Sequence, residues 1–381
     1  MKTVFEFLKK EAMLTVSLAA AIVSLFITPP GAALLKEIDW HTLGTLFMML
    51  SVLEGFKKEN IFQPLIDLSC NFARMTSLSL FLIFGVFFSS MFVTNDVSLI
   101  IFVPLTIILF RSGNKEKYIL PVLTMENIAA IRGSLLMPFG SPQNLFLYGR
   151  ANVSVWHFML HMAPLCISSA LLLIIFVFVL YRRDTAEEIH PVQTAKKAWN
   201  SPAAKRRKIT YIALFALIVA TIVSRTSLWP FAVLIVAAAI AVTDRQILRQ
   251  TDYVLLLTFL CFFIFSSSIA ANPGIAAFLQ KLVAGHEYWC AIGLSQLISN
   301  VPATIVLYPF TENFAGLIYG ADTAGLCSLI GSLASVINYR IYVREYPGNG
   351  GRFIKTFTLI SWAFFLTVVI PGWLLCRWRF F

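Results

Sequence analysis

Two short polar groups interrupt long apolar stretches of this chain. Thr94, Asn95 and Asp96 lie within "MFVTNDVSLIIFVPL", and Ser299 and Asn300 lie within "ISNVPATIVLYP". Hydroxyl and carboxamide side chains can coordinate a cation or hydrogen-bond an anion, and a carboxylate can hold a cation or carry a proton. We therefore expect these residues to bind ions or small solutes. Capping of a helix end by the same side chains is the alternative.

A second polar feature is a helix broken by proline and glycine. The segment "RGSLLMPFGSPQNLFLYG" (132–149) contains two prolines and three glycines. Proline removes a helix hydrogen bond, so residues 137–143 should be unwound. The segment "GSLASVIN" (331–338) lacks proline but is rich in small polar residues, and we expect a second break there. Interrupted helices in matching places point to a binding site, and a kink that serves only packing is the alternative.

The elements that hold these residues are predicted to be membrane helices. Hydrophobic residues make up 58% of the 381, charged residues 13%, and the mean hydropathy is +0.79. Apolar runs long enough to cross a bilayer recur along the chain without the period-two alternation of barrel strands. The first run, near 12–28, is followed by "TPPG" rather than a cleavage site, so we expect a retained span. The sequence predicts an all-α polytopic membrane protein.

The basic residues suggest a topology with about nine full spans and two re-entrant hairpins. The full spans are expected near 12–28, 40–56, 118–149, 161–181, 209–225, 229–243, 253–271, 323–343 and 355–376. The hairpins are expected at 76–110, with its tip at Thr94–Asp96, and at 288–311. Positive loops favour the cytoplasm, so we expect the N-terminus and the basic loop 182–208 to be cytoplasmic. Because the net charge of +11 follows this pattern, anionic lipid heads are the expected partner and nucleic acid is not.

Four landmarks recur in the same order in the two halves of the chain. They are Asp39–Trp40 and Asp252–Tyr253, Thr94–Asn95 and Ser299–Asn300, Pro104 and Pro309, and Gly133–Ser134 with Asn144 and Gly331–Ser332 with Asn338. We therefore predict a first inverted repeat at 1–181 and a second at 209–381, which carries one extra span at about 209–225. The basic loop 182–208 joins them. Inverted repeats are typical of alternating-access transporters, with the site where the repeats meet.

Charged residues in the expected spans suggest how the site is neutralised. Asp96 could be a cation ligand, a proton carrier or the partner of Arg132. Arg132 could bind an anionic substrate, neutralise Asp96 or Glu126, or belong to a purely structural pair. The six cysteines form no Cys-x-x-Cys pair, so we expect no metal centre or cofactor, apart from a sodium ion at Thr94, Asn95 and Asp96.

Several of these segments resemble the ion transporter superfamily. This superfamily contains arsenite pumps, sodium–proton antiporters of the D type, citrate transporters and divalent-anion sodium symporters. The matching pieces are "IDW", "TNDVSLIIFVPLT", "ENIAAIRGSLLMPFGSPQNLFLYG", "ISNVPATIVLYP" and "GSLASVINY". The resemblance implies two inverted repeats arranged as a scaffold and a moving transport domain, and commonly a homodimer.

The resemblance also implies which residues form the substrate or ion site. The candidates are Thr94, Asn95, Asp96, Gly140, Ser141, Pro142, Asn144, Ser299, Asn300, Gly331, Ser332 and Asn338, with Arg132 and Glu126 as charge partners or gating residues. Sodium-coupled dicarboxylate carriers typically have a Ser-Asn-Thr triplet at both tips. Here the triplets are Thr-Asn-Asp and Ser-Asn-Val, and Asp96 makes proton coupling plausible because a carboxylate removed from water takes up a proton more readily.

These observations predict a secondary active transporter of a small carboxylate or inorganic anion, coupled to protons or sodium. An arsenite-type efflux carrier and a sodium–proton antiporter are alternatives within the same class. An ion channel is an alternative from another class, and it would conduct without saturating. An intramembrane aspartyl protease would need a Gly-x-Gly-Asp pattern, which this chain lacks, so we expect no enzymatic activity and no catalytic residues.

Overall fold

A computed structural model describes residues 11–28, 31, 36, 38–69, 72–182, 188–189, 202–224 and 227–377. In these ranges the chain is helical and has no strand, which confirms the predicted all-α polytopic class. Residues 1–10 and most of the basic loop, 183–187 and 190–201, lie outside the described residues. The cytoplasmic position of the N-terminus and of this loop therefore stays a prediction.

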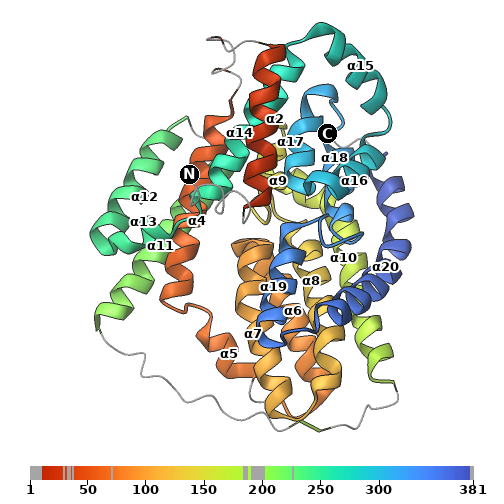
Figure 1. The fold of residues 1–381 in the computed structure, drawn as a ribbon. Coiled ribbons are helices and arrows are strands. Elements are labelled where there is room, and N and C mark those ends of the chain that lie inside the picture. The colour runs from red at the N-terminus through yellow and green to blue at the C-terminus, as the bar shows by residue number, and fades with distance from the viewer. Residues whose placement is uncertain are drawn as a thin grey trace.

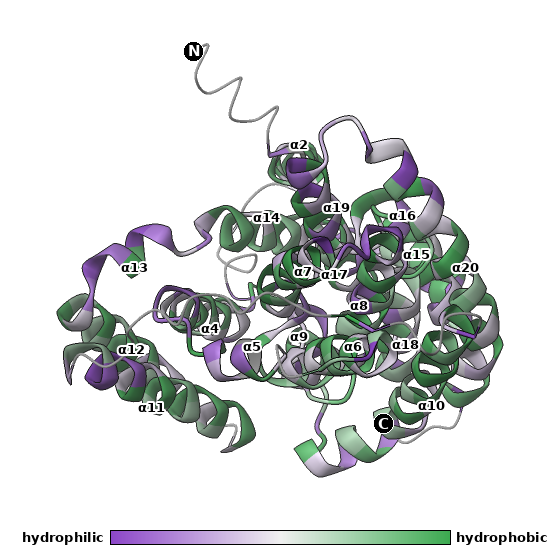
Figure 2. Ribbon diagram, turned by 90° about the horizontal axis from the view of Figure 1, so that it is seen from below, coloured by the Kyte–Doolittle hydropathy of each residue, from purple (hydrophilic) through white to green (hydrophobic). Residues whose placement is uncertain are grey.

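Six described helices are long and apolar enough to cross a bilayer, judged by length and composition. They are α6 (Met75–Val93), α7 (Asn95–Ser112), α10 (Val155–Leu180), α11 (Pro202–Ser224), α14 (Tyr253–Ala270) and α20 (Gly350–Leu375). Figure 2 shows apolar ribbon at the rim of the molecule, on α10, α11, α12 and α20. Exposed Leu160, Ile167 and Leu171 of α10 belong to this rim, as expected for a surface in contact with lipid.

One group of helices, here the scaffold group, lies on the left and at the upper centre of Figure 1. It comprises α2 (Ala12–Ile27), α4 (Trp40–Lys58), α11, α12 (Trp229–Thr243), α13 (Arg245–Gln250) and α14. Trp229 of α12 and Tyr211 of α11 pack directly on Gly44 and Gly55 of α4, where a Cβ atom would collide with their rings. The Ser268 hydroxyl of α14 donates to a carbonyl of α2 at 2.7 Å, so these helices form one packed body.

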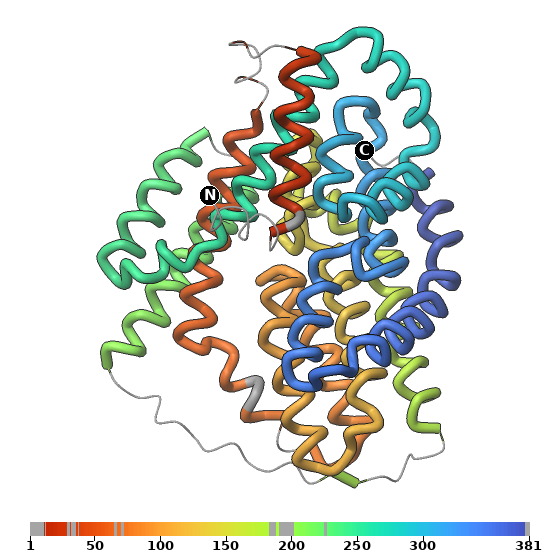
Figure 3. Tube along the Cα trace, viewed as in Figure 1, coloured from red at the N-terminus to blue at the C-terminus, as the bar shows by residue number. Residues whose placement is uncertain are grey.

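Ten of the other described helices form the hairpin group. Beside α6, α7, α10 and α20 it contains α8 (Ile119–Ser134), α9 (Pro142–Arg150), α16 (Glu287–Ile298), α17 (Asn300–Leu307), α18 (Phe314–Ala324) and α19 (Leu333–Glu345). The α6–α7 hairpin lies in the lower half of Figures 1 and 3, and the α16–α17 hairpin lies in the upper half. The interrupted helices α8–α9 and α18–α19 pass between the two halves in opposite senses. This arrangement is the one that the predicted inverted repeats require, although the repeats themselves stay a prediction.

Four further elements join the helices of these groups. They are α5 (Gln63–Ser69), α15 (Pro273–Val283) and the 3₁₀ turns η1 (Glu116–Tyr118) and η2 (Tyr308–Phe310). The two predicted Asp–aromatic landmarks are helix N-caps: Asp39 accepts the Thr42 N–H and Asp252 accepts the Leu255 N–H, both at 2.9 Å. A carboxylate at this position satisfies a free N–H and complements the helix dipole, so it defines where each helix begins.

Both helix breaks lie a few residues earlier in the chain than predicted. The first was predicted at 137–143, and the unwound residues are 135–141, because Pro142 starts α9 instead of interrupting it. The second was predicted within 331–338, whereas the unwound residues are 325–332. Asn338 therefore lies inside α19, and its predicted place at a break was wrong.

Candidate substrate and ion site

The two predicted hairpin tips have the same backbone conformation. Thr94 has φ 73° and ψ 155°, and Ser299 has φ 70° and ψ 160°. A positive φ is strained for a residue other than glycine, especially for a β-branched one, and such strain gathers at functional sites. After each tip residue an Asn Oδ1 accepts the next backbone N–H, at 2.9 Å for Asn95 and 3.0 Å for Asn300.

The two tips differ in how they meet the breaks. The Asn300 N–H donates to the Gly331 carbonyl at 3.2 Å, and Gln296 donates to the Ala324 carbonyl at 3.2 Å. The second tip is therefore tied to the second break. The Asn95 N–H makes no backbone hydrogen bond to any described residue, so the first tip is not tied in this way.

A cavity of about 130 Å³ lies at the first tip, and we call it the deep cavity. Thr94 and Asp96 line it from the tip, and Ser141 and Pro142 line it from the first break. The N-termini of α7 and α9 thus meet at one cavity, where their partial positive charges favour an anion.

Carboxylates add negative charge to the deep cavity, beside the partial positive charge of the helix N-termini. Asp252 and the Glu54–Lys57 ion pair line it together with Asp96. The Asp96 Oδ1 is buried and has no hydrogen-bond partner among the described residues. This oxygen is free to accept a proton or to coordinate a cation, while the helix N-termini suit an anion.

The first break is held together by Asn144. Its Nδ2 donates to the Ser134 carbonyl at 3.1 Å and to the Leu135 carbonyl at 3.5 Å, which caps the end of α8 across the gap. Ser141 caps α9 by accepting the Asn144 N–H at 3.4 Å. Gly140 is required because a Cβ atom there would collide with the Ser134 carbonyl. The Asn144 Oδ1 is buried and unpartnered within the described structure, so it remains available to a ligand.

The second break repeats this geometry at Gly331 and Ser332. A Cβ atom on Gly331 would collide with the Ala324 carbonyl at the end of α18, and Ser332 is the residue before α19. The geometric counterpart of Gly331–Ser332 is therefore Gly140–Ser141. The predicted pairing with Gly133–Ser134 was wrong by seven residues.

Asn338 connects α19 to α8 rather than lining a break. Its Nδ2 donates to the Leu123 carbonyl at 2.7 Å, and nearby Asn127 donates to the Ser335 hydroxyl at 3.0 Å. The Oδ1 atoms of Asn127 and Asn338 are both buried without a partner in the described ranges. These side chains form a polar layer between the two interrupted helices.

Arg132 forms an ion pair with Asp322, and both side chains are buried. Its Nη2 also donates to the Thr323 hydroxyl at 3.3 Å. Arg132 and Asp322 each lie two residues before the end of an interrupted helix, so the pair joins α8 to α18. Of the alternatives predicted for Arg132, neutralisation of Asp96 or Glu126 is not the one found, because its ionic partner is Asp322. Asp322 was missed, although a carboxylate within the apolar run "AGLIYGADTAGL" (315–326) could have drawn attention to it.

Glu126 is a second buried carboxylate without a cationic partner in the described part of the chain. Its Oε1 accepts a hydrogen bond from the Thr106 hydroxyl of α7, and its Oε2 has no partner there. No cluster of three or more His, Cys, Asp or Glu side chains among the described residues could hold a metal ion.

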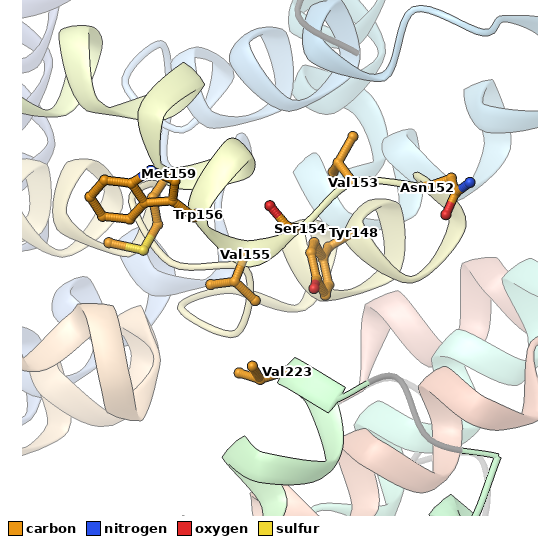
Figure 4. Close-up of a pocket in the computed structure, with 8 residues that line it drawn as sticks. All are labelled: Tyr148, Asn152, Val153, Ser154, Val155, Trp156, Met159 and Val223. Atoms are coloured by element: carbon orange, nitrogen blue, oxygen red, sulfur yellow. The ribbon is translucent and has the colours of Figure 1, made fainter.

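A larger hollow lies away from these residues. It measures about 600 Å³ and is lined by Tyr148, Asn152, Val153, Ser154, Val155, Trp156, Met159 and Val223. Figure 4 shows Val223 of α11 facing Val155 and Tyr148 across the gap. No charged side chain and no predicted site residue lines it, so the polar chemistry lies at the tips and breaks instead.

Comparisons with known proteins identify a family and relatives that this chain resembles. A family model with the description "Citrate transporter" matches residues 5–322. The inner membrane protein YbiR of Escherichia coli is 31% identical over 343 residues, which cover 89% of this chain and 88% of the relative. The uncharacterized transporter MJ0456 of Methanocaldococcus jannaschii is 30% identical over 335 residues, 87% of this chain and 88% of the relative.

Proposed function

Because this chain belongs to the citrate transporter family and is a multi-pass membrane transporter, we propose that it moves a small anion by secondary active transport. The anion is a carboxylate such as citrate or a dicarboxylate, or an inorganic anion, and its movement is coupled to protons or sodium. The N-terminus and the 182–208 loop are cytoplasmic in this proposal, and the protein is a homodimer.

The observation that carries the proposal is the deep cavity, where two helix N-termini meet a carboxylate. The N-termini of α7 and α9 supply the anion-binding groups, and the free Asp96 Oδ1 supplies a place for the coupling ion. A volume of about 130 Å³ corresponds to roughly four water molecules, which suits a small anion or an ion with part of its hydration shell.

Charge repulsion explains why transport would be coupled. An anion about 4 Å from an ionised Asp96 is repelled by about 4 kcal/mol at an effective dielectric constant of about 20. A proton or a sodium ion on Asp96 removes this repulsion, which amounts to about a thousandfold in affinity. The anion and the cation therefore bind together. Only the empty site and the fully loaded site then switch from one side of the membrane to the other.

The two helix groups suggest how access changes. The scaffold group lines one wall of the deep cavity with α4 and α14, and the hairpin group lines the other with α7 and α9. A displacement of the hairpin group along the scaffold group would carry the site from one side of the membrane to the other.

Sodium–proton antiport is a second candidate function. The observation that favours it is the acidic lining, in which Asp96, Asp252 and Glu54 face a single cation, Lys57. In this case the carboxylates would hold sodium and protons in turn, and no anion would move.

Uptake into proteoliposomes tests the proposal. Labelled citrate, succinate, phosphate and arsenite are offered under an imposed sodium gradient or pH gradient, applied separately. Asp96→Asn should allow anion equilibration but abolish gradient-driven accumulation, because the neutral carboxamide mimics a loaded site. Asp67→Asn, an equivalent change on the exposed short helix α5, is the control. If no anion moves and a sodium gradient shifts the internal pH, the antiport reading replaces this one.

A further inference from the structure

A third cavity lies between α9, α14 and η2, at the boundary between the two helix groups, and we call it the outer cavity. It measures about 410 Å³. Phe146 and Arg150 of α9 form one side, Ser266 and Ser267 of α14 form another, and Tyr308 of η2 lies between them. Among the described residues that line it, only Arg150 is charged, so the cavity has the opposite charge to the acidic deep cavity.

The Arg150 guanidinium is held in place from one edge. Its Nε donates to the Asp39 Oδ2 at 3.1 Å. The guanidinium carbon, Cζ, lies 5.4 Å from the centre of the Tyr308 ring and 5.9 Å from the centre of the Phe146 ring, within the range of cation–π attraction. The two terminal nitrogens make no hydrogen bond to any described residue. These two nitrogens are spaced to bind both oxygens of a carboxylate or phosphate group.

Asp39 does not depend on Arg150 for its hydrogen bonds. Its Oδ1 accepts the Thr42 N–H at 2.9 Å, and its Oδ2 accepts the Thr42 hydroxyl at 2.9 Å. As the N-cap of α4 it is also stabilised by the helix dipole. Asp39 therefore fixes one edge of the guanidinium, and a bound anion need not displace it.

Another part of the cavity wall depends on a proline. Pro309 has no N–H, so the Ile305 carbonyl four residues earlier lacks its helix donor. The Ser266 hydroxyl donates to this carbonyl at 2.8 Å. The Ser266 hydroxyl proton is therefore already used in this hydrogen bond. Ser267 and Tyr308 are the other hydroxyl-bearing residues of the lining.

The two cavities follow one boundary between the helix groups. Leu255 of α14 and its N-cap Asp252 line the deep cavity, and Ser266 of α14 lines the outer one. At 1.5 Å per residue, Leu255 and Ser266 are about 16 Å apart along the helix axis. On α9, Pro142 lines the deep cavity and Arg150 lines the outer cavity.

We propose that the outer cavity is an anion-capture site, in which the terminal nitrogens of Arg150 bind a carboxylate or phosphate group before the anion reaches the deep cavity. This inference rests on the proposed anion transport. It assigns Arg150 and Asp39 opposite effects on anion affinity, since Arg150 attracts the anion and Asp39 repels it. A purely structural ion pair would make the two substitutions equivalent.

Initial uptake rates against anion concentration test this assignment. Arg150→Gln should raise KM for citrate or phosphate about tenfold to a hundredfold with the maximal rate nearly unchanged, because a charge-assisted hydrogen bond is lost. Asp39→Asn, which preserves the N-cap, should lower KM. Lys281→Gln on the nearby exposed helix α15 is the control and should leave KM unchanged. Equal changes of KM in the Arg150 and Asp39 variants would overturn the capture site.

Direct binding to lipid-free protein in detergent separates this inference from the proposed function. Thermal stabilisation by citrate or inorganic phosphate that requires Arg150 supports capture of a free anion, even if no variant transports. Stabilisation that requires Arg150 but occurs only with a short-chain phospholipid would assign the cavity to a lipid headgroup and overturn the inference. Binding that Arg150→Gln leaves intact would also overturn it.

Discussion

The Arg132–Asp322 pair allows a quantitative test of how the two interrupted helices are held together. Both side chains are buried, and the pair joins the end of α8 to the end of α18. Arg132→Met leaves an unpaired carboxylate, and Asp322→Leu leaves an unpaired guanidinium. Each should lower the free energy of unfolding by about 3–5 kcal/mol, because removal of one partner leaves a buried charge without compensation.

The double variant should be far more stable than either single variant. Replacing both members of a buried pair by apolar residues is often neutral or stabilising, so Arg132→Met/Asp322→Leu should lie close to the wild type. If the two sites were independent, the losses would add to about 6–10 kcal/mol. The coupling energy is therefore the quantity to measure.

Unfolding in mixed micelles at a series of denaturant concentrations supplies the four free energies of this double-mutant cycle. The exposed pair Arg111–Glu345 serves as the control, and its removal should change stability by about 1 kcal/mol or less. Additive losses in the Arg132 and Asp322 variants would refute the view that the two helix ends form one unit.

Three further substitutions test the first break and the surface of the scaffold group. Gly140→Ala should abolish uptake and lower the yield of folded protein, because its Cβ would collide with the Ser134 carbonyl. Asn144→Ala should lower stability by about 1–3 kcal/mol, measured by denaturant unfolding, because the buried carbonyls at the end of α8 lose their donor. Hydrogen bonding to Lys58 lowers the pKa of Asp244, so this pair stabilises the protein above the ordinary Asp pKa of 3.8 and loses that effect as pH falls. Asp244→Asn should therefore destabilise by about 1 kcal/mol or less at pH 7, and this difference should shrink in unfolding curves measured at decreasing pH.

Each of these substitutions has a control or a contradicting result. Gly293→Ala is the control for Gly140→Ala and should transport normally, because no atom beyond its chain neighbours and its own helix backbone lies within 4 Å of the added Cβ. A fully stable Asn144→Ala variant would show that the α8 end finds other donors. A stability difference for Asp244→Asn that persists at low pH would contradict the assigned role of Lys58.

Local chemistry made much of the fold predictable. The apolar run at 229–243 coincides with α12, and the Asp39 and Asp252 landmarks cap α4 and α14. The tip at Thr94 was predicted because polar residues inside an apolar run need a break in the helix. In each case the deciding interactions lie within a few residues of each other in the chain.

Features that depend on contacts between distant segments could not be predicted from the sequence pattern. Gly133 and Gly140 look alike as Gly–Ser pairs, but Gly133 packs against the Phe87 carbonyl of α6 whereas Gly140 turns the chain at the break. The partner of Arg132 lies 190 residues away in the chain, so no local spacing could identify it. The tie between the Asn300 N–H and Gly331, which the first tip lacks, likewise depends on the packed structure.

The short halves of the interrupted helices have an electrical consequence. The helices α9, α18 and α19 contain 9, 11 and 13 residues, or about 14, 17 and 20 Å, each shorter than the roughly 30 Å hydrocarbon core. In the proposed transporter we therefore expect the breaks to lie near the middle of the membrane, at about half of the voltage drop. A cation that reached Asp96 from the positive side would gain about 1.1 kcal/mol per 100 mV, and one that arrived from the negative side would lose the same amount. In the proposed transport cycle the neutral Arg132–Asp322 pair would cross the same field at no electrical cost, so membrane voltage would act on the cargo and on Asp96 but not on the link between the helices.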